Sequence, residues 1–295
     1  MASDAVVRFW RPSETPSTDF LCAYLEGGQA APHLHEEWQF VVAEGPSAVS
    51  VGAFRRFSVD LGCVAVVAPY EVHTERGGTT SARRCRILHV AGPVVALFQK
   101  GTAGRPGYST PGFESPVLTD PRAAAELRTL LWASESEAMG DEFVSLVSLW
   151  LRQLIARHAT ERALPAISPA VERTRVYLRD HPTQAVSLPE MVSVAGVTVS
   201  HLIRSFSRVV GLPPLAYHAQ VRLAHARRLL IEGRSVTWVA HECGFTDQSH
   251  LSRRFKKCYG VTPGAFQAQS RAGPLAGPSG HAADFANDTA ASHAA

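Results

Sequence analysis

Long apolar segments are missing from this sequence. Its 295 residues hold no run of 18 or more apolar residues, so we expect no transmembrane helix. The first residues lack the basic and apolar stretches of a signal peptide, and we therefore expect a cytoplasmic protein. Cysteine is scarce: the five cysteines are scattered and never spaced C-x-x-C, which argues against a disulfide framework and a zinc finger. The composition, 45% apolar and 19% charged, excludes a mainly disordered or coiled-coil chain.

The basic residues are gathered towards the C-terminus. Residues 1–165 hold 15 basic and 18 acidic side chains, whereas residues 166–272 hold 14 basic and 6 acidic ones. A basic third attached to an acidic body indicates a polyanionic partner such as nucleic acid. The alternative is a solvated arginine-rich surface, since 26 of the 29 basic residues are arginine.

Short strand-like runs dominate residues 1–118. They are rich in β-branched and apolar residues and are separated by turns that contain Gly or Pro. The runs cover residues 38–43, 48–54, 63–68 and 86–91. Many short strands at this spacing predict a β-barrel or β-sandwich domain.

A helical hairpin is predicted over residues 119–162. Apolar residues recur there at spacings of three and four, with a break near Gly140. Such a hairpin must bury its apolar stripe, either on its own barrel or against a second subunit. We favour the second subunit and expect a homodimer formed through residues 121–160. Residues 163–167 are predicted to be a linker.

The C-terminal part, residues 168–268, is predicted to be entirely helical and contains an internal repeat. At a shift of 49 residues, Ser200-His201-Leu202 recurs as Ser249-His250-Leu251, and further identical or similar residues recur as far as Pro214 and Pro263. Two copies of one pattern predict two similar supersecondary units. The last residues, 269–295, are rich in Ala with few apolar anchors, and we predict a disordered tail there.

Each copy has the pattern of a helix-turn-helix. A short helix is followed by a glycine turn and then by a second helix, capped by Thr198 in the first copy and Asp247 in the second. Between the copies, residues 214–232 predict a helix about 28 Å long at 1.5 Å per residue. Such a connector could hold two recognition helices about one turn of DNA apart. The alternative is a generic helical bundle with a duplicated hairpin.

The outward residues of the second helices argue against a generic bundle, because they are side chains that reach bases and phosphates. We predict that the base readers are Ser200, Ile203, Arg204, Gln248, Ser249, Ser252 and Arg253. We predict that the phosphate contacts are Arg208, Lys256 and Lys257. The expected partner is double-stranded promoter DNA, bound in adjacent major grooves.

These residues resemble a known family. The segment VAHECGFTDQSHLSRRFKKCYGVTPGAF, residues 239–266, is similar to the DNA-binding domain of the AraC/XylS transcriptional regulators, and SHLIRSF with Gly211 and Tyr217 is similar to its first half. The resemblance covers about one third of the chain and implies a transcription regulator with recognition helices at residues 199–210 and 247–258. It also makes RNA polymerase a candidate partner. The sequence departs from the family at Gln267, where many members carry a basic residue, and at the apolar Ile203.

Three histidines are the notable residues of the first half. His33 and His35 are two residues apart, so on a strand both rings would point to one face, and His73 from a facing strand would complete a three-histidine metal site. The segments 32–37 and 62–73 are similar to the two cupin motifs. Members of the AraC/XylS family often carry such a domain as the effector-binding part.

The cupin resemblance leaves three alternatives open. Metal-binding cupins place a Glu four or five residues after the second His, where this sequence has Gln39 and Phe40, although Glu37 would share the face. We favour a small-molecule effector pocket made by His33, His35, Trp38, Phe40 and His73. The alternatives are a metal-sensing regulator and a metal-dependent cupin enzyme, both using His33, His35 and His73.

The sequence therefore predicts a two-domain α+β protein. A cupin-like barrel (1–118) and a helical hairpin (119–162) precede a double helix-turn-helix domain (168–268). We expect a one-component regulator controlled by an effector whose identity the sequence does not reveal. We expect no catalytic residues, cofactor, bound metal or membrane association.

Overall fold

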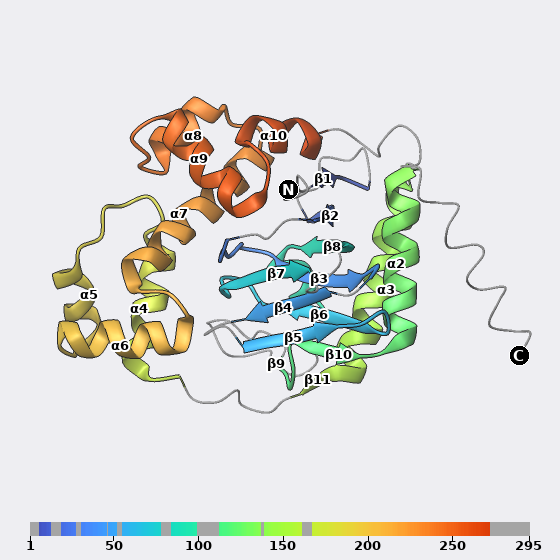
Figure 1. Ribbon diagram of the computed structural model, residues 1–295, viewed down its shortest axis with the longest axis horizontal. Helices are drawn as coiled ribbons and strands as arrows, with labels where there is room; N and C mark the ends of the chain where they lie inside the picture. The colour runs from blue at the N-terminus through green and yellow to red at the C-terminus, as the bar shows by residue number, and fades with distance from the viewer. Residues whose placement is uncertain are drawn as a thin grey trace, which may run out of the picture.

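The structure, a computed structural model, describes nine segments of the chain. They cover residues 6–12, 19–27, 31–45, 47–51, 55–77, 84–98, 112–136, 139–160 and 167–271. The predicted tail beyond residue 271 and most of the predicted linker, residues 163–166, lie outside the described residues. Figure 1 shows β-sheets at the centre, two long helices on one side, and the C-terminal helices on the other.

The described part of the first half contains two main antiparallel sheets and one two-stranded pair, in agreement with the predicted β-rich domain. The larger has the order β1-β2-β8-β3-β6-β10 and the smaller the order β5-β4-β7, while β9 pairs with β11. The strands are β1 (Val6–Trp10), β2 (Phe20–Glu26), β3 (Trp38–Ala43), β4 (Ser47–Val51), β5 (Arg55–Val59), β6 (Cys63–Val67), β7 (His73–Gly77), β8 (Arg84–Val90), β9 (Gly112–Phe113), β10 (Val117–Thr119) and β11 (Ala159–Thr160), with the short helix α1 (Gly92–Ala96) after β8. The predicted strand at residues 38–43 is confirmed with its bounds; of the run at 48–54, the residues up to Val51 form β4, and residues 52–54 lie outside the described residues.

The helical hairpin covers one face of the larger sheet. Its helices are α2 (Pro121–Ser136) and α3 (Gly140–His158), separated near Gly140 as predicted. Their apolar stripe, including Leu127 and Trp150, is buried against Phe40 and its neighbours in the same chain. The expectation that a second subunit buries this stripe is therefore wrong. The stripe packs on its own sheet because the pleat of β3 presents large apolar side chains to it.

Seven helices lie within residues 167–271, the part of the second half that the structure describes. They are α4 (Pro169–Asp180), α5 (Leu188–Ala195), α6 (Val199–Val210), α7 (Pro214–Ile231), α8 (Val236–Glu242), α9 (Gln248–Tyr259) and α10 (Pro263–Arg271). Two helix-turn-helix units, α5–α6 and α8–α9, are joined by the connector α7, which ends one residue before the predicted Glu232. The predicted caps are confirmed: Thr198 accepts from the His201 amide and Asp247 from the His250 amide.

The two halves share their hydrophobic cores. Leu34, from the loop before β3, is buried among residues of the first helix-turn-helix unit. Phe9 of β1 meets Phe266 of α10 edge to face, with ring centroids 4.9 Å apart. The Tyr259 hydroxyl donates to the backbone oxygen of Leu34 over 3.1 Å. The docking of the C-terminal half is thus apolar and extensive. Within the described segments, no helix has the length and apolarity needed to cross a membrane.

Candidate nucleic-acid interface

Helix α6 presents one polar face to solvent. Its buried face is apolar and includes Leu202, Phe206 and Val210. Opposite that face, Ser200, Arg204 and Arg208 are exposed, and Ile203 is partly buried. The Arg204 Nε donates to the backbone oxygen of Ser200 over 3.3 Å, so its guanidinium is held along the helix surface. The structure therefore brings the four predicted contact residues of this unit onto one accessible helix.

Helix α9 has the same arrangement with more charge. Leu251, Phe255 and Tyr259 face inward. The exposed residues include all the predicted contacts of this unit except Ser252, which is partly exposed: Gln248, Ser249, Arg253, Lys256 and Lys257. The Gln248 side-chain oxygen accepts from the Thr237 hydroxyl of α8 over 2.9 Å, which orients its amide. Arg254 is also exposed on this helix and was not among the predicted contacts.

Both turns are held by an arginine from the preceding helix. Arg173 of α4 donates to the backbone oxygens of Val194 and Ala195, at the end of the first helix of its unit. Arg222 of α7 donates to the equivalent oxygens of Cys243 and Gly244. These carbonyls have no partner within the helix, so a guanidinium that binds two of them fixes the turn. These two arginines were not among the residues predicted from the sequence, although both arginines and both carbonyl pairs obey the 49-residue shift.

Gln267 has a structural role in this fold. Its side-chain nitrogen donates to the backbone oxygens of Leu230 and Arg234, over 3.0 and 2.7 Å. It thus joins α10 to the C-terminal end of the connector α7, where the Leu230 oxygen also accepts from the Gly233 amide. The departure from the family at this position replaces a basic side chain by one that ties α10 to α7.

The histidines of the first half are buried together beside the connector. His33 and His73 pair across an isolated β-bridge, and their ring centroids are 4.4 Å apart. The ring centroid of His35 lies 4.8 Å from that of His73 and 5.0 Å from that of His89. His89 belongs to β8 and was not among the residues predicted from the sequence. His89 joins the cluster because it pairs with Gln39 across β8 and β3.

The rings are oriented by backbone carbonyls. The Nδ1 atoms of His33, His35 and His73 lie 2.9, 2.8 and 2.9 Å from the backbone oxygens of Ala31, Glu37 and Glu71. A neutral ring that donates its Nδ1–H in this way carries its lone pair on Nε2. Burial, together with the electrostatic influence of His73, Arg227 and His33, holds the pKa of His35 well below its ordinary value. His35 is therefore neutral near pH 7.

Trp38 and Phe40 do not join the histidines, which corrects the predicted pocket. Both are buried on the opposite face of β3, where the Phe40 ring meets Trp150 of α3 edge to face at 5.4 Å. Gln39, between them in sequence, points to the histidine side and contacts His35. Successive side chains of a strand point to opposite faces, so one strand cannot present Trp38, Gln39 and Phe40 to one pocket.

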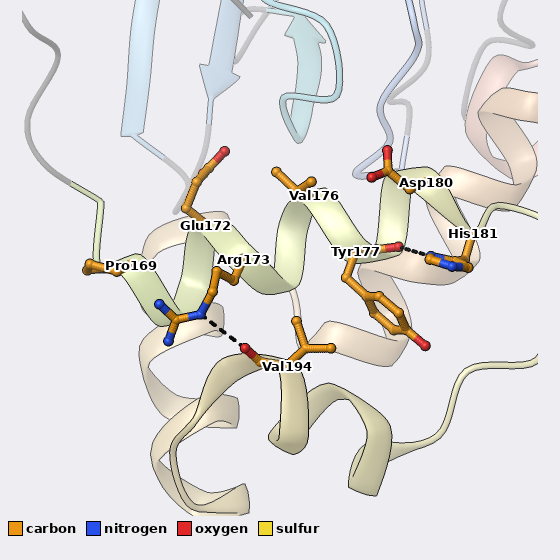
Figure 2. Close-up of a pocket in the computed structure, with 8 residues that line it drawn as sticks. All are labelled: Pro169, Glu172, Arg173, Val176, Tyr177, Asp180, His181 and Val194. Carbon is orange, nitrogen blue, oxygen red and sulfur yellow. Dashed lines mark hydrogen bonds between the residues drawn. The ribbon is translucent and has the colours of Figure 1, made fainter. Parts of the chain in front are cut away.

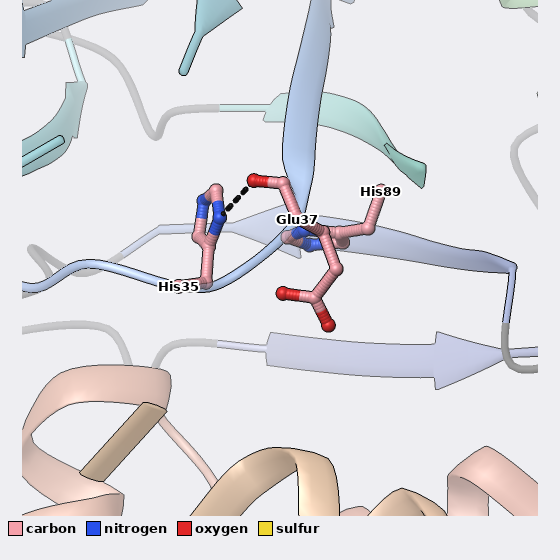
Figure 3. A group of neighbouring side chains, drawn as sticks. All are labelled: His35, Glu37 and His89. Atoms are coloured by element: carbon pink, nitrogen blue, oxygen red, sulfur yellow. Dashed lines mark hydrogen bonds between the residues drawn. The ribbon is translucent and has the colours of Figure 1, made fainter. Parts of the chain in front are cut away.

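The side chains whose ligand atoms lie close enough together to bind a metal also differ from the predicted metal ligands. Among the described residues, ligand atoms of His35, Glu37 and His89 all lie within 4.8 Å of one another. Figure 3 shows His35 and Glu37 on the segment that enters β3, with His89 behind them. The predicted set of His33, His35 and His73 is not such a group.

The loop that carries His35 is bound to the connector by charge. Glu37 forms an ion pair with Arg227, whose side chain is only 2% exposed. Its neighbour Glu36 pairs with Arg228 over 3.0 Å and lies 3.7 Å from His225. All three partners belong to α7, the helix that joins the two helix-turn-helix units. The histidine cluster is thus one residue away from the contacts that hold the DNA-binding half in place.

A groove of about 530 Å³ lies elsewhere, on the first helix-turn-helix unit. Figure 2 shows it between α4 and α5, where Arg173 reaches Val194 and the His181 ring bonds to the backbone oxygen of Tyr177. None of the residues predicted to bind an effector or DNA lines this groove.

Comparison with known proteins agrees with the geometry of the C-terminal half. Residues 191–269 match the family described as a helix-turn-helix domain. Over 225 residues, the chain is 26% identical to the uncharacterized HTH-type transcriptional regulator YbfI of Bacillus subtilis, covering 74% of this chain and 79% of that protein. The chain therefore carries a helix-turn-helix DNA-binding domain and is similar to a transcription regulator over most of its length.

The fold of the whole regulator is also found in solved structures. Unsaturated fatty acid bound ToxT from Vibrio cholerae has a TM-score of 0.56 and 9% identity, covering 94% of this chain and 99% of that one. An apo form of ToxT that carries one substitution has a TM-score of 0.55 and 10% identity, covering 86% and 98%. At such identities the likeness shows the two-domain fold, in which a β-rich half precedes the helical DNA-binding half.

Proposed function

We propose that this regulator is a one-component switch, in which an effector bound by the N-terminal half controls promoter binding by the C-terminal half. The observation that carries the proposal is the direct contact between the histidine-bearing loop and α7. Glu36 and Glu37 pair with arginines of that helix, and Tyr70 accepts through its backbone oxygen from the Tyr217 hydroxyl over 3.3 Å. An effector that moves this loop changes the docking of the helix that spaces both units.

The proposed DNA contacts are the outward residues of α6 and α9, placed in adjacent major grooves. Arg204 and Arg253 read bases, because a bidentate arginine–guanine contact discriminates by about 1–3 kcal/mol. The polar residues Ser200, Gln248, Ser249 and Ser252 supply weaker base contacts, and Ile203 packs on a thymine methyl group. Arg208, Lys256 and Lys257 hold phosphates.

The proposed effector site is the histidine side of the larger sheet, at His33, His35 and His73, without Trp38 and Phe40. The solved ToxT structure holds an unsaturated fatty acid, so the same fold accommodates a small molecule in that protein. The proposal places the regulator in the cytoplasm as a dimer that acts on RNA polymerase, and it assigns no catalytic step to any residue.

DNA binding by the purified full-length protein tests the first part. A pool of random duplexes is selected for binding, and affinity for the selected sequence is measured by fluorescence anisotropy. Arg204→Ala and Arg253→Ala should each relax sequence preference at separate positions, about one DNA turn apart. Arg122→Ala, which removes an exposed arginine of α2, is the matched control and should bind as the wild type does. The proposal is contradicted if no sequence is selected, or if all three variants lose DNA affinity equally.

The proposed control of DNA binding by an effector is tested by measuring the coupling between the two ligands in both directions. A ligand that changes the affinity for DNA by some factor must have its own affinity changed by DNA by the same factor. Both constants are measured at equilibrium on one protein sample. Unequal factors would show that the two sites are not linked through this protein.

A further inference from the structure

We propose that the junction between the two halves binds a divalent transition-metal ion through His35, Glu37 and His89, and that the ion competes with Arg227 for the Glu37 carboxylate. This inference rests on the proposed function, because it names the chemical class of an effector. The three residues come from two elements, the segment entering β3 and the strand β8, and their ligand atoms lie within 4.8 Å of one another. Two imidazoles and a carboxylate suit zinc and related first-row ions.

The first argument is the orientation of His35. Its Nδ1 lies 2.8 Å from the Glu37 backbone oxygen, to which it donates, so the neutral ring has its lone pair on Nε2. Metal-binding histidines commonly donate their other ring nitrogen to a carbonyl in this way. In this tautomer the Nε2 lone pair faces the Gln39 side-chain oxygen, which cannot donate to it, so the Gln39 amide must present its NH2 group or turn away, and turning away opens Nε2 to an ion.

The second argument is the incomplete pairing of Glu37. Its carboxylate contacts Arg227 through Oε1, whereas the buried Oε2 has no hydrogen-bond partner among the described residues. The buried Nη2 atom of Arg227 likewise has no hydrogen-bond partner among the described residues. Unsatisfied buried charge is costly, so this pair is poised to exchange one partner for another. In Figure 3 the Glu37 carboxylate points to the side of the view on which helices are drawn, with one strand between them.

Competition between the metal ion and Arg227 for the Glu37 carboxylate follows from their like charges. Metal–nitrogen and metal–oxygen bonds of about 2.0–2.2 Å require the three ligand atoms to move closer together. The Glu37 carboxylate must then turn from Arg227 to the ion, and an ion of charge +2 repels the guanidinium that it has displaced. Arg227 is fixed in α7, so metal binding weakens the contact that docks this helix on the N-terminal half.

Metal binding is tested on the reduced full-length protein after treatment with a chelator. Calorimetry with Zn²⁺ and visible absorption with Co²⁺ should show one ion per chain. Glu37→Gln and His89→Gln should weaken binding by about tenfold or more. His158→Gln is the matched control: it removes a partly buried histidine of α3 that pairs with Asp120 outside the cluster, and it should leave the affinity unchanged. No stoichiometric binding, equal loss in His158→Gln, or a Co²⁺–thiolate absorption band overturns the proposed site.

The competition between the metal ion and Arg227 is tested separately. Arg227→Gln should raise the affinity for Zn²⁺ several-fold, while Arg228→Gln, which breaks the neighbouring pair with Glu36, should not change it. Because Arg227→Gln can impair folding, hydrogen exchange of the wild type gives a second measurement. Amides of α7 should exchange faster with Zn²⁺ bound, and unchanged or slower exchange overturns the competition. These measurements contain no DNA, so their failure is distinct from a failure of sequence-specific DNA binding.

Discussion

Arg173 and Arg222, which lie 49 residues apart, make the same pair of hydrogen bonds in the two helix-turn-helix units. Each donates to two consecutive backbone oxygens where the first helix of its unit gives way to the turn, Val194 and Ala195 in one unit and Cys243 and Gly244 in the other. The duplication therefore includes the helix before each unit, so that α4 corresponds to the middle of α7. The connector is at once a spacer and the first helix of the second unit.

Removing one of these arginines should loosen its own unit. We expect Arg222→Ala to lower the free energy of unfolding by about 1–3 kcal/mol, because two helix-end carbonyls lose a charged donor. Urea unfolding measures the loss, and Arg254→Ala is the control because its side chain is exposed on α9. Arg173→Ala should act in the same way on the first unit. A change of Arg222→Ala no larger than that of Arg254→Ala would contradict this role.

The phosphate contacts should be separable from the base contacts by their salt dependence. Lys256→Ala should reduce the slope of log affinity against log salt by about 0.9 and weaken binding to all duplexes alike. Arg253→Ala should instead reduce the difference between the selected sequence and one altered at a single base pair, by about 1–3 kcal/mol. The comparison needs both duplexes over a range of salt concentrations. If Lys256→Ala changes the preference between duplexes, its assignment to phosphate is wrong.

Asp120 should make stability depend on pH in the acid range. Burial raises the pKa of Asp120, but the Ala123 amide, the His158 ring and Arg157 outweigh it and hold the pKa below its ordinary value of 3.8. The unfolded chain then binds a proton at a higher pH than the folded chain does. The stabilisation is complete above the unfolded pKa and is lost as pH falls through the folded one.

Asp120→Asn isolates this charge, because Asn also caps helices well. At pH 7 the variant should be less stable than the wild type by about 0.5–1 kcal/mol, since it loses the pairing with Arg157 and His158. Urea unfolding at pH 7 and pH 3 should show the gap closing in acid. A gap that is equal at both values would show that the carboxylate charge contributes nothing.

A dimer, if formed by the hairpin, must use its outer side, because the apolar stripe is buried on the sheet. Trp132 and Leu149 are 46% and 42% exposed on α2 and α3. We expect Trp132→Glu to shift the wild-type dimer to monomer in analytical ultracentrifugation without lowering stability. Leu127→Ala, at a fully buried site, should cost about 2–5 kcal/mol of stability instead. A monomeric wild type at micromolar concentrations would refute the dimer.

The helix-turn-helix half was accessible from sequence because its determinants are local. Caps, glycine turns and apolar spacing act within one or two helical turns, so Thr198 and Asp247 could be assigned without a structure. Solvent exposure of Arg204 and Arg253 followed from the same spacing. Arg173 and Arg222 follow the repeat as well, and extending the 49-residue comparison back to α4 would have found them.

The face on which each side chain of β3 lies was also implied by sequence. Gln39 separates Trp38 from Phe40, and alternation along a strand places it opposite both. The predicted pocket ignored this alternation in favour of nearness in sequence. The same alternation explains why the hairpin found an apolar surface on its own sheet and needed no second subunit for its stripe.

The sequence by itself determined that this chain has two recognition helices with a polar, basic outer face, because local spacing sets which side of a helix is buried. Only the tertiary structure placed His89 beside His35, since that depends on the pairing of β8 with β3. Only the tertiary structure joined Glu37 to Arg227, 190 residues along the chain. Such contacts depend on how separately formed elements dock, and docking is decided by the shape and charge of whole surfaces rather than by the spacing of residues.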